Sequence, residues 1–410
     1  MPLVLIAALN APSTADAADR CVRFGPAGAR GAQALVVARP GVDVRQAVLR
    51  GAQDGKGPVA VRPSPRPCAL TFVVADGELV VPGWSGTIRS DSTRLDGVVA
   101  AADVADAVRG ADVLHPGGRT NLPRLEERLD RTHHQRIRVR IGLAAILIAL
   151  AVAAPRRAIV AGPAAIAAAL VLSAFGSTSV VLFVLLTLLG TLAPLRALWL
   201  FFAAYLVVLV ASPETQSLAL LGPHPEAGGR FYGLTNELET LLLAPALVLG
   251  LAAAPLVILL VAWSRAGADG GGAVVFLGAY AVLALGLSAR RLTVAAGIAV
   301  AAALALVGID AATGGSSHVT KTVGDGPDAV WDAVTHRWSV AWHGATATPG
   351  RALLNLVLLA GLVWVAAQRP RHRVLDAFLV GVAVSLAVND TPQDVLLWGA
   401  LQGVALRRSL

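Results

Sequence analysis

The chain has 410 residues, of which 56% are hydrophobic and 15% charged, and its mean hydropathy is +0.67. Soluble globular proteins carry about 25% charged residues, so this composition excludes a single soluble enzyme. Residues 1–140 hold 33 charged side chains, whereas the much longer stretch 141–410 holds only 27. We therefore expect a soluble N-terminal part followed by a membrane part.

The isoelectric point near 10.6 does not indicate a nucleic-acid partner. Only Lys56 and Lys321 are lysines, so 32 of the 34 basic residues are arginine, which is typical of GC-rich coding. The arginines also gather where membrane topology requires positive charge. No nucleic acid is expected as a partner.

Residues 1–20 allow two interpretations. The apolar stretch Leu3–Leu9 is followed by an A-x-A-like pattern at Ala15–Ala17, which is typical of a cleaved signal segment. The charged region that opens a signal segment is missing, so these residues can equally form the first strand of the next domain.

Residues 21–140 predict a small α/β extracytoplasmic domain. Strands are expected over 34–38, 58–62, 69–74 and 78–81, and helices over 42–51, 101–110 and 121–131. Cys21 and Cys68 are the only cysteines. Outside the cytoplasm they would pair, and the alternative is two buried thiols.

Residues 141–410 predict an all-α polytopic membrane domain of about eleven transmembrane helices, since a span needs about 20 apolar residues. The run 238–263 allows one long helix or two short helices broken at Ala254–Pro255. With two helices, the candidate spans are 141–155, 158–175, 178–193, 197–212, 238–253, 254–268, 272–288, 292–311, 351–368, 374–389 and 392–407.

The arginine distribution favours two helices, because short cytoplasmic loops are enriched in Arg and Lys. With eleven spans, ten arginines lie at inner ends and eleven of the twelve carboxylates after residue 140 lie at outer ends. This topology is that of a multi-pass protein of the bacterial cytoplasmic membrane, with the N-terminal domain outside and the C-terminus inside. One group of arginines on the outer side disagrees with it: Arg131, Arg136, Arg138 and Arg140.

Under this topology every polar insertion opens toward the outer face. The insertions are 175–179, 224–239, 267–272, 313–350 and 389–394. Polar groups at membrane depth are costly and usually line a cavity. The sequence therefore predicts an outward-facing polar site.

The stretch RFYGLTNE supplies the strongest candidates. Arg230 suits phosphate or carboxylate recognition, Tyr232 and Asn236 can bind substrate, and Glu237 can transfer a proton. The alternative is structural: Asn236 as helix N-cap with Glu239 at N3 forms a capping box, and Arg and Tyr fit a membrane-interface belt.

The motif NDTPQD near the C-terminus supplies Asn389 as a binding residue and Asp390 as an acid or base. Here too a structural alternative exists. Thr391 at the N-cap, Pro392 at N1 and Asp394 at N3 are typical of a helix start.

Asp269 is the only charge in the stretch GADGGG and is a candidate binding residue. The glycines favour either a tight turn or a close backbone approach. In the long loop, His318 is a candidate catalytic residue and Lys321 a candidate phosphate ligand, with solvated loop residues as the alternative.

The loop residues 327–342 place tryptophans at helical spacing, which predicts an amphipathic helix in the outer interface. The outer histidines show no metal-ligand spacing such as H-E-x-x-H. No metal site is predicted, and the sequence leaves cofactors open.

In chain order, GRFYGLTNE, GADGGG, the SSH loop and VNDT resemble stretches of a group of bacterial polytopic membrane proteins. In those proteins the stretches read YGIGNE, GANxGG, SHxGR and NDSG, and an extracytoplasmic domain of the alkaline phosphatase superfamily often precedes the membrane part. Residues 83–108 resemble the end of such a domain. The resemblance implies the same architecture here.

The chain also departs from that group. About 140 residues precede the first span, too few for a whole phosphatase-like domain, and the metal-binding Asp and His clusters and the Ser or Thr nucleophile have no counterpart. The resemblance therefore implies a reduced N-terminal domain without phosphatase activity. Thr235 replaces a Gly of the group, and Asp269 replaces an Asn.

Three functions are compatible with these residues, and whether the protein is an enzyme stays open. The first is cell-envelope biogenesis on an anionic lipid-linked or phosphate-bearing precursor, with Arg230 binding and Glu237 or Asp390 as acid or base. The second is a secondary transporter or flippase that uses Asp269, Glu237 and Asp390 along a path. The third is a noncatalytic envelope scaffold. In each case membrane lipid is a partner.

Overall fold

The computed structural model describes residues 5–8, 20–24, 31–37, 44, 48, 70–75, 78–82, 84–108, 112–223, 231–288 and 326–410, with single residues between 290 and 308. The chain divides into two compact units. Unit 1 comprises Met1–His134 and Pro223–Tyr232, and unit 2 comprises Gln135–Gly222 and Gly233–Leu410.

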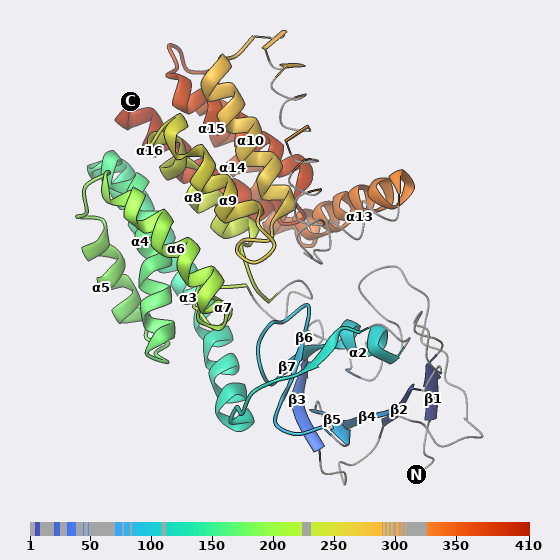
Figure 1. Ribbon diagram of the computed structural model, residues 1–410. Helices are drawn as coiled ribbons and strands as arrows, with labels where there is room; N and C mark the ends of the chain where they lie inside the picture. The colour runs from blue at the N-terminus through green and yellow to red at the C-terminus, as the bar shows by residue number, and fades with distance from the viewer. Residues whose placement is uncertain are drawn as a thin grey trace. The chain divides into compact units, whose positions relative to one another are not determined.

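Unit 1 contains a mixed six-stranded sheet in the order β1-β2-β4-β5-β3-β7 (Figure 1). Its strands are β1 Leu5–Ala8, β2 Arg20–Phe24, β3 Gly31–Val37, β4 Leu70–Ala75, β5 Glu78–Pro82 and β7 Val98–Ala100. The pairs β2–β4 and β3–β7 are parallel and the other pairs antiparallel. A second, two-stranded sheet pairs β6 Ile88–Ser90 with β8 Leu114–Pro116.

Helix α2, Ala101–Val108, covers one face of this sheet. Alternate residues of a strand share a face, and Ala34 and Val36 of β3 lie with Leu79 and Val81 of β5 in one buried cluster. Val104 of α2 joins that cluster. These contacts form the small α/β core that the sequence predicts.

The predicted strands over 34–38, 69–74 and 78–81 correspond to β3, β4 and β5. Residues 5–8 form a strand paired with β2, the second of the two interpretations of the N-terminal segment. The predicted strand over 58–62 lies outside the described residues. Cys21 lies in β2 and Cys68 is not described, so their pairing stays a prediction.

The described part of unit 2 is built from helices, and most of the described residues of the chain are helical. The helices are α3 Leu122–Ala153 (which begins in unit 1), α4 Pro155–Ala174, α5 Val180–Gly190, α6 Ala197–Ala211, α7 Pro213–Ser217, α8 Asn236–Val248, the 3₁₀ helix η2 Leu251–Ala253, α9 Ala254–Ala262, α10 Gly270–Leu285, α13 Pro327–Thr346, α14 Pro349–Ala367, α15 Arg373–Val388 and α16 Pro392–Ser409. Ten of the eleven candidate spans overlap one of these helices, and most of 292–311 lies outside the described residues.

Two of the described helices, α4 and α14, are long and apolar enough to cross a membrane. The apolar helices α5, α6 and α10 and the run η2–α9 are shorter, with 11, 15, 16 and 12 residues. The sequence predicts about eleven crossings, and that number stays a proposal.

The run 238–263 forms two helices that reverse direction. α8 ends before Gly250, whose φ of +79° lies in the region that glycine adopts easily. After η2 and α9 the chain returns to the start of α8, where the Leu234 N–H donates to the Gly267 carbonyl at 2.9 Å. The break that the sequence places at Ala254–Pro255 thus lies a few residues earlier.

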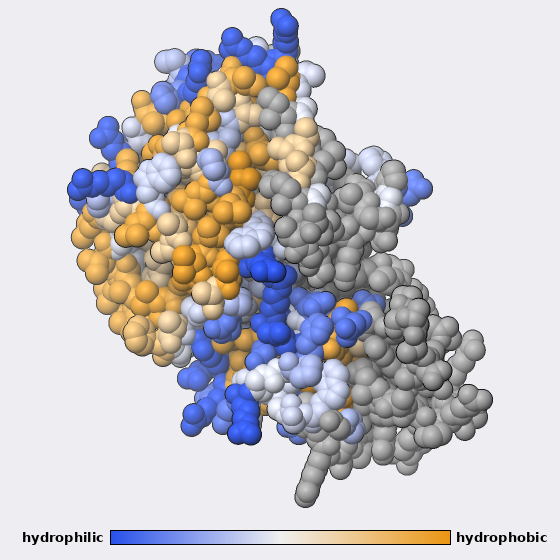
Figure 2. Space-filling view, viewed as in Figure 1, coloured by the Kyte–Doolittle hydropathy of each residue, from blue (hydrophilic) through white to orange (hydrophobic). Residues whose placement is uncertain are grey.

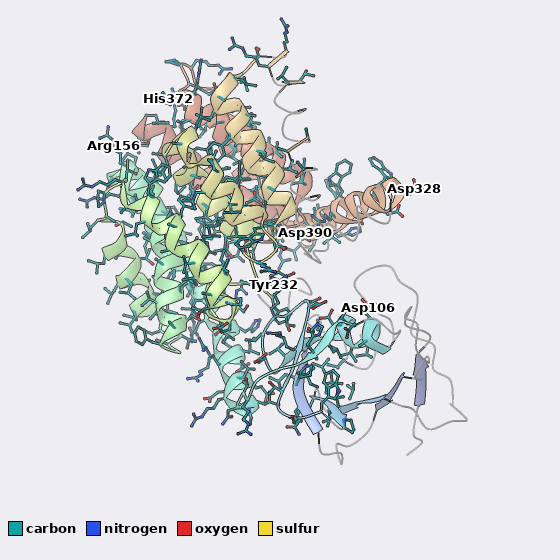
Figure 3. All side chains as sticks on the ribbon, in the orientation of Figure 1. Asp106, Arg156, Tyr232, Asp328, His372 and Asp390 are labelled. Carbon is teal, nitrogen blue, oxygen red and sulfur yellow. The ribbon has the colours of Figure 1, made fainter. Side chains whose placement is uncertain are left out.

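Charged side chains of unit 2 are largely sorted by sign between its two ends; Arg140, which pairs with Glu237, and Asp376, which pairs with Arg371, are exceptions. Figure 3 labels Arg156 and His372 at one end and Asp390 at the other. The carboxylate end, as we call it, carries Glu237, Glu239, Asp269, Asp390 and Asp394. The arginine end carries Arg156, Arg157, Arg371, Arg373, Arg407 and Arg408.

Large apolar side chains are exposed along several helices of unit 2, as the orange areas of Figure 2 show. Only 17% of the most apolar stretch of α14 is buried, against 78% for α4. Leu353, Leu356 and Val363 of α14 are all exposed. Water-soluble proteins rarely expose apolar patches of this extent.

Candidate functional site

The start of α8 positions the first group of polar side chains. Thr235 is its N-cap, and the Thr235 Oγ1 accepts a hydrogen bond from the Leu238 N–H at 3.3 Å. The predicted capping box is therefore wrong: Asn236 is the first helical residue, and Glu239 lies beyond the capping position. Both side chains are left available for other contacts.

A close backbone contact fixes where α8 begins. Gly233 has a φ of +79°, and a Cβ there would lie 2.0 Å from the Gly267 carbonyl oxygen. Only glycine fits this approach, which holds the loop after α9 against the start of α8.

The outermost layer of the site joins α8 to the segment between α15 and α16. The Asn236 Nδ2 donates to Asp390 Oδ1 at 3.0 Å and to Thr391 Oγ1 at 2.8 Å. Asp390, labelled in Figure 3, is exposed. The structure thus brings together Asn236 and Asp390, two residues that the sequence predicts for the site.

The middle layer is an ion-pair network around Arg140 of α3. The Arg140 Nε lies 3.2 Å from Glu237 Oε1, and its Nη2 contacts Asp394 of α16. The Glu237 side chain is only 4% exposed, so the guanidinium compensates a nearly buried carboxylate. This pairing accounts for an arginine among the carboxylates, at the end that the predicted topology puts outside.

Two of the other arginines that disagree with the predicted topology also have partners within the chain. Arg136 donates to the Gly222 carbonyl at 3.0 Å, and Arg131 pairs with Glu127 one helical turn away. Their positions follow from contacts within the chain.

The deepest layer contains Glu239, which is fully buried on α8. Its Oε2 accepts from the Asn389 Nδ2 at 2.9 Å, and the same amide nitrogen donates to Ser385 Oγ at 2.8 Å. Asp269 is also buried, and its charge acts on Glu239. Three helices, α8, α10 and α15, therefore bring these side chains to one place.

The glycine run GADGGG permits this deep layer to form. Asp269 is the N-cap of α10 and accepts from the Gly272 N–H at 3.0 Å. A Cβ on Gly271 would lie 2.7 Å from Asn389 Oδ1. The close approach of backbone to side chain is observed at Gly271, and a turn over 264–267 precedes it.

The motif NDTPQD starts a helix, as its structural alternative predicts. Thr391 is the N-cap of α16 and Pro392 its first residue, but the Thr391 side chain makes no capping hydrogen bond. Asp394 pairs with Arg140. The motif therefore starts a helix and also supplies side chains to all three layers.

The remaining predicted residues lie elsewhere. Tyr232 belongs to unit 1, where its ring lies 3.6 Å below the Arg94 guanidinium, and the neighbouring Phe231 N–H donates to the Ser92 carbonyl at 3.0 Å. Arg230, His318 and Lys321 lie outside the described residues.

Sequence reasoning missed four members of the site: Arg140, Glu239, Ser385 and Asp394 as an ion-pair partner. Glu239 carried a signal, because a carboxylate within an apolar run is costly unless it has a partner. Arg140 and Asp394 are 254 positions apart, and no local pattern links them. Within the described part of the chain, no group of three or more His, Cys, Asp or Glu side chains is placed to hold a metal ion.

Two polar side chains farther from the site have structural roles. Pro245 lacks an N–H, so the Leu241 carbonyl has no helical partner, and the Gln402 Nε2 donates to it at 2.9 Å. The Tyr280 hydroxyl donates to the Ala246 carbonyl at 3.1 Å. Their contacts stabilise the helices.

Comparison with known proteins gives no relative: no family model matches the chain, and neither curated proteins nor solved structures show a significant match.

Proposed function

We propose that the chain is an integral membrane protein and that unit 2 lies in the bilayer. The observation that carries this proposal is the exposure of α14, a 19-residue apolar helix of which little is buried. A soluble protein would bury such a helix, whereas lipid tails cover it at no cost.

The orientation follows from the two ends of unit 2. Arg and Lys are enriched on the cytoplasmic side of membrane proteins, so the arginine end faces the cytoplasm and the carboxylate end faces outward. Helix α13 supports this arrangement, because the Trp338 Nε1 donates to the Ala387 carbonyl at the carboxylate end. Its exposed tryptophans then lie at headgroup level, as expected for an interfacial helix.

The function that we propose for the polar site is cell-envelope biogenesis on an anionic lipid-linked or phosphate-bearing precursor. Asp390 is exposed and can reach a ligand, and the nearly buried Glu237 is a second acid or base. The Arg140 guanidinium can bind a phosphate in place of one of its carboxylate partners, because it forms paired hydrogen bonds with either anion. Arg230 is the further anion-binding residue that the sequence suggests.

A secondary transporter is the second candidate, and the broken pair α8–α9 favours it, because interrupted helices are common at transport sites. The polar side chains of Gln402 and Tyr280 bond to helix carbonyls and do not line a path through the membrane. This favours a site that opens on one side only. The resemblance to polytopic envelope proteins agrees with either function.

The test is the envelope glycolipid profile of a strain in which the gene is deleted and then replaced by variants. Glu237→Gln and Asp390→Asn should fail to restore the profile. Glu214→Gln removes an exposed carboxylate on α7, outside the three layers, and should restore it. An unchanged profile in the deletion strain, or full restoration by the first two variants, contradicts the proposal.

A further inference from the structure

A pocket at the arginine end takes no part in the polar site at the other end of unit 2. It has a volume of about 340 Å³ and lies where the start of α4 packs beside the last turn of α16. Figure 3 labels Arg156 there. We call it the arginine pocket, and its lining residues are Ala154, Pro155, Arg156, Arg157, Arg408 and Ser409.

The positive charge of the arginine pocket has no counterpart within the chain. Its three arginines are exposed, and no Asp or Glu lines it. In the part of the chain that the structure describes, none of these three side chains forms a hydrogen bond or an ion pair. Two neighbours at the same end differ, because Arg371 pairs with Asp376 and Arg407 donates to the Gln368 side chain. The guanidinium groups of the pocket are therefore available to a ligand.

The helix ends around the pocket do not cancel this charge. α3 and α16 end beside it, and α4 begins there. A helix end carries about half an elementary charge, negative at the C-terminus and positive at the N-terminus. Three full charges exceed these partial charges, so the pocket attracts anions.

A phosphate group matches the chemistry and the size of the pocket. A guanidinium forms paired hydrogen bonds with phosphate oxygens. Pockets for small molecules have volumes of about 300 to 1,000 Å³, and the arginine pocket is at the lower limit of this range. It has room for a phosphate-bearing headgroup but not for acyl chains as well.

Exposed apolar side chains beside the pocket favour a lipid as the source of the phosphate. Ile141, Ile148 and Val152 of α3 are exposed, and their spacing of seven and four residues places them on one face of the helix. α3 ends at Ala153, directly before the first residue of the pocket. Acyl chains that cover this face would end near the arginines.

The proposed orientation places the arginine end at the inner leaflet, where anionic phospholipids are found. We propose that the arginine pocket binds the phosphate of an anionic phospholipid whose acyl chains lie along α3. This inference rests on the proposed membrane location and does not depend on the envelope function.

Thermal unfolding of the purified full-length protein in a neutral detergent tests this proposal, with tryptophan fluorescence as the readout. A ligand that binds only the folded state raises the unfolding midpoint. Phosphatidylglycerol should raise the midpoint, and phosphatidylcholine with the same acyl chains should raise it less, because its headgroup has no net charge. Inorganic phosphate has the shared chemistry without acyl chains, so it should act only at far higher concentrations.

Variants of the pocket identify the site. In the double variant Arg156→Gln and Arg408→Gln, about tenfold or more phosphatidylglycerol should be needed for the same rise. The matched control is Arg369→Gln with Arg373→Gln, which removes two exposed arginines at the same end but outside the pocket. It should respond as the unmodified protein does. Arg408→Lys keeps the charge but loses the paired hydrogen bonds, so it should weaken binding less than Arg408→Gln.

Four results would overturn the assignment: no rise with phosphatidylglycerol, an equal rise with phosphatidylcholine, an equal rise with the same concentration of inorganic phosphate, or an equal loss in the two double variants. Glu237→Gln separates this inference from the envelope function, because it should lose the glycolipid phenotype and keep the response to phosphatidylglycerol. A chain that stays in solution without detergent would contradict the membrane location itself.

Discussion

At the scale of single residues, the middle layer of the site depends on Arg140. Its guanidinium contacts Glu237, which is nearly buried, and Asp394. Removing one partner of a buried pair leaves the other charge uncompensated, and that loss is far larger than the net contribution of an exposed pair.

Arg140→Ala should therefore lower the free energy of unfolding by about 3 kcal/mol. Arg138→Ala is the matched control, because Arg138 is exposed and, among the described residues, donates only to Gln135; its effect should stay within about 0.5 kcal/mol. Chemical denaturation in detergent measures both. The added change Glu237→Gln should recover part of the loss in the Arg140→Ala protein, and equal destabilisation by both arginine variants would contradict this account.

Gly271 offers a second prediction at this scale. Alanine usually stabilises a helix relative to glycine by about 1 kcal/mol, but a Cβ on Gly271 would meet Asn389 Oδ1 at 2.7 Å. Gly271→Ala should therefore destabilise the protein by about 1 to 3 kcal/mol. In the same helix, a Cβ on Gly278 would lie 3.9 Å from Val384, so Gly278→Ala should be neutral or stabilising in the same unfolding experiment.

The sequence predicts several residues of the site, and the residues that it does not predict show what local sequence patterns leave out. Asn236, Asp269, Asn389 and Asp390 stand out because polar residues interrupt apolar runs there. Placing the N-cap one residue late, at Asn236, gave Glu239 a capping role that it does not have. The cap depends on backbone dihedral angles that Thr235 and Asn236 can both adopt.

At the scale of elements, the hairpin of α8 and α9 brings together two segments that contribute to the site. Its reversal depends on Gly250, which has a φ of +79° and open space around its α-carbon. The hairpin places the loop after α9 beside the start of α8, through the contact between Leu234 and Gly267. The site would lose its shape if this reversal opened.

Gly250→Ala should destabilise the protein by about 1 kcal/mol, since an L-residue is strained at positive φ and no neighbour otherwise opposes the new methyl group. Gly361→Ala in α14 is the control. Gly361 also has open space around it but ordinary helical geometry, so alanine should stabilise there. The difference between the two unfolding midpoints is the measurement, and a zero difference would show that the reversal does not depend on glycine.

Helix positions were predictable because apolar runs separated by Gly, Pro and Arg leave few choices. The strands β3, β4 and β5 were predictable for a similar reason, as short β-branched runs between turn residues. Hydropathy does not show which helices pack against each other. For example, α10 packs on α15, which lies far from it in the chain. The layered site results from such pairings.

At the scale of the whole molecule, the sorting of charge along unit 2 gives a topology that labelling can test. In a variant with Cys21 and Cys68 replaced by Ser, a cysteine at Glu214 should react with a membrane-impermeant maleimide in intact cells. A cysteine at Arg369, on the arginine side, should react only after the membrane is opened. Labelling in the reverse order would contradict the proposed orientation.

Under the proposed membrane location, the short helices of unit 2 have a consequence for the surrounding lipid. α5 has 11 residues, which corresponds to about 16 Å, and Leu182, Leu185 and Leu189 along it are exposed. The hydrocarbon core of a bilayer is about 30 Å thick. The bilayer beside α5 must therefore become thinner, or polar groups at the ends of this helix would lie in the hydrocarbon. Such thinning would lower the height over which a lipid headgroup has to travel to reach the outward site.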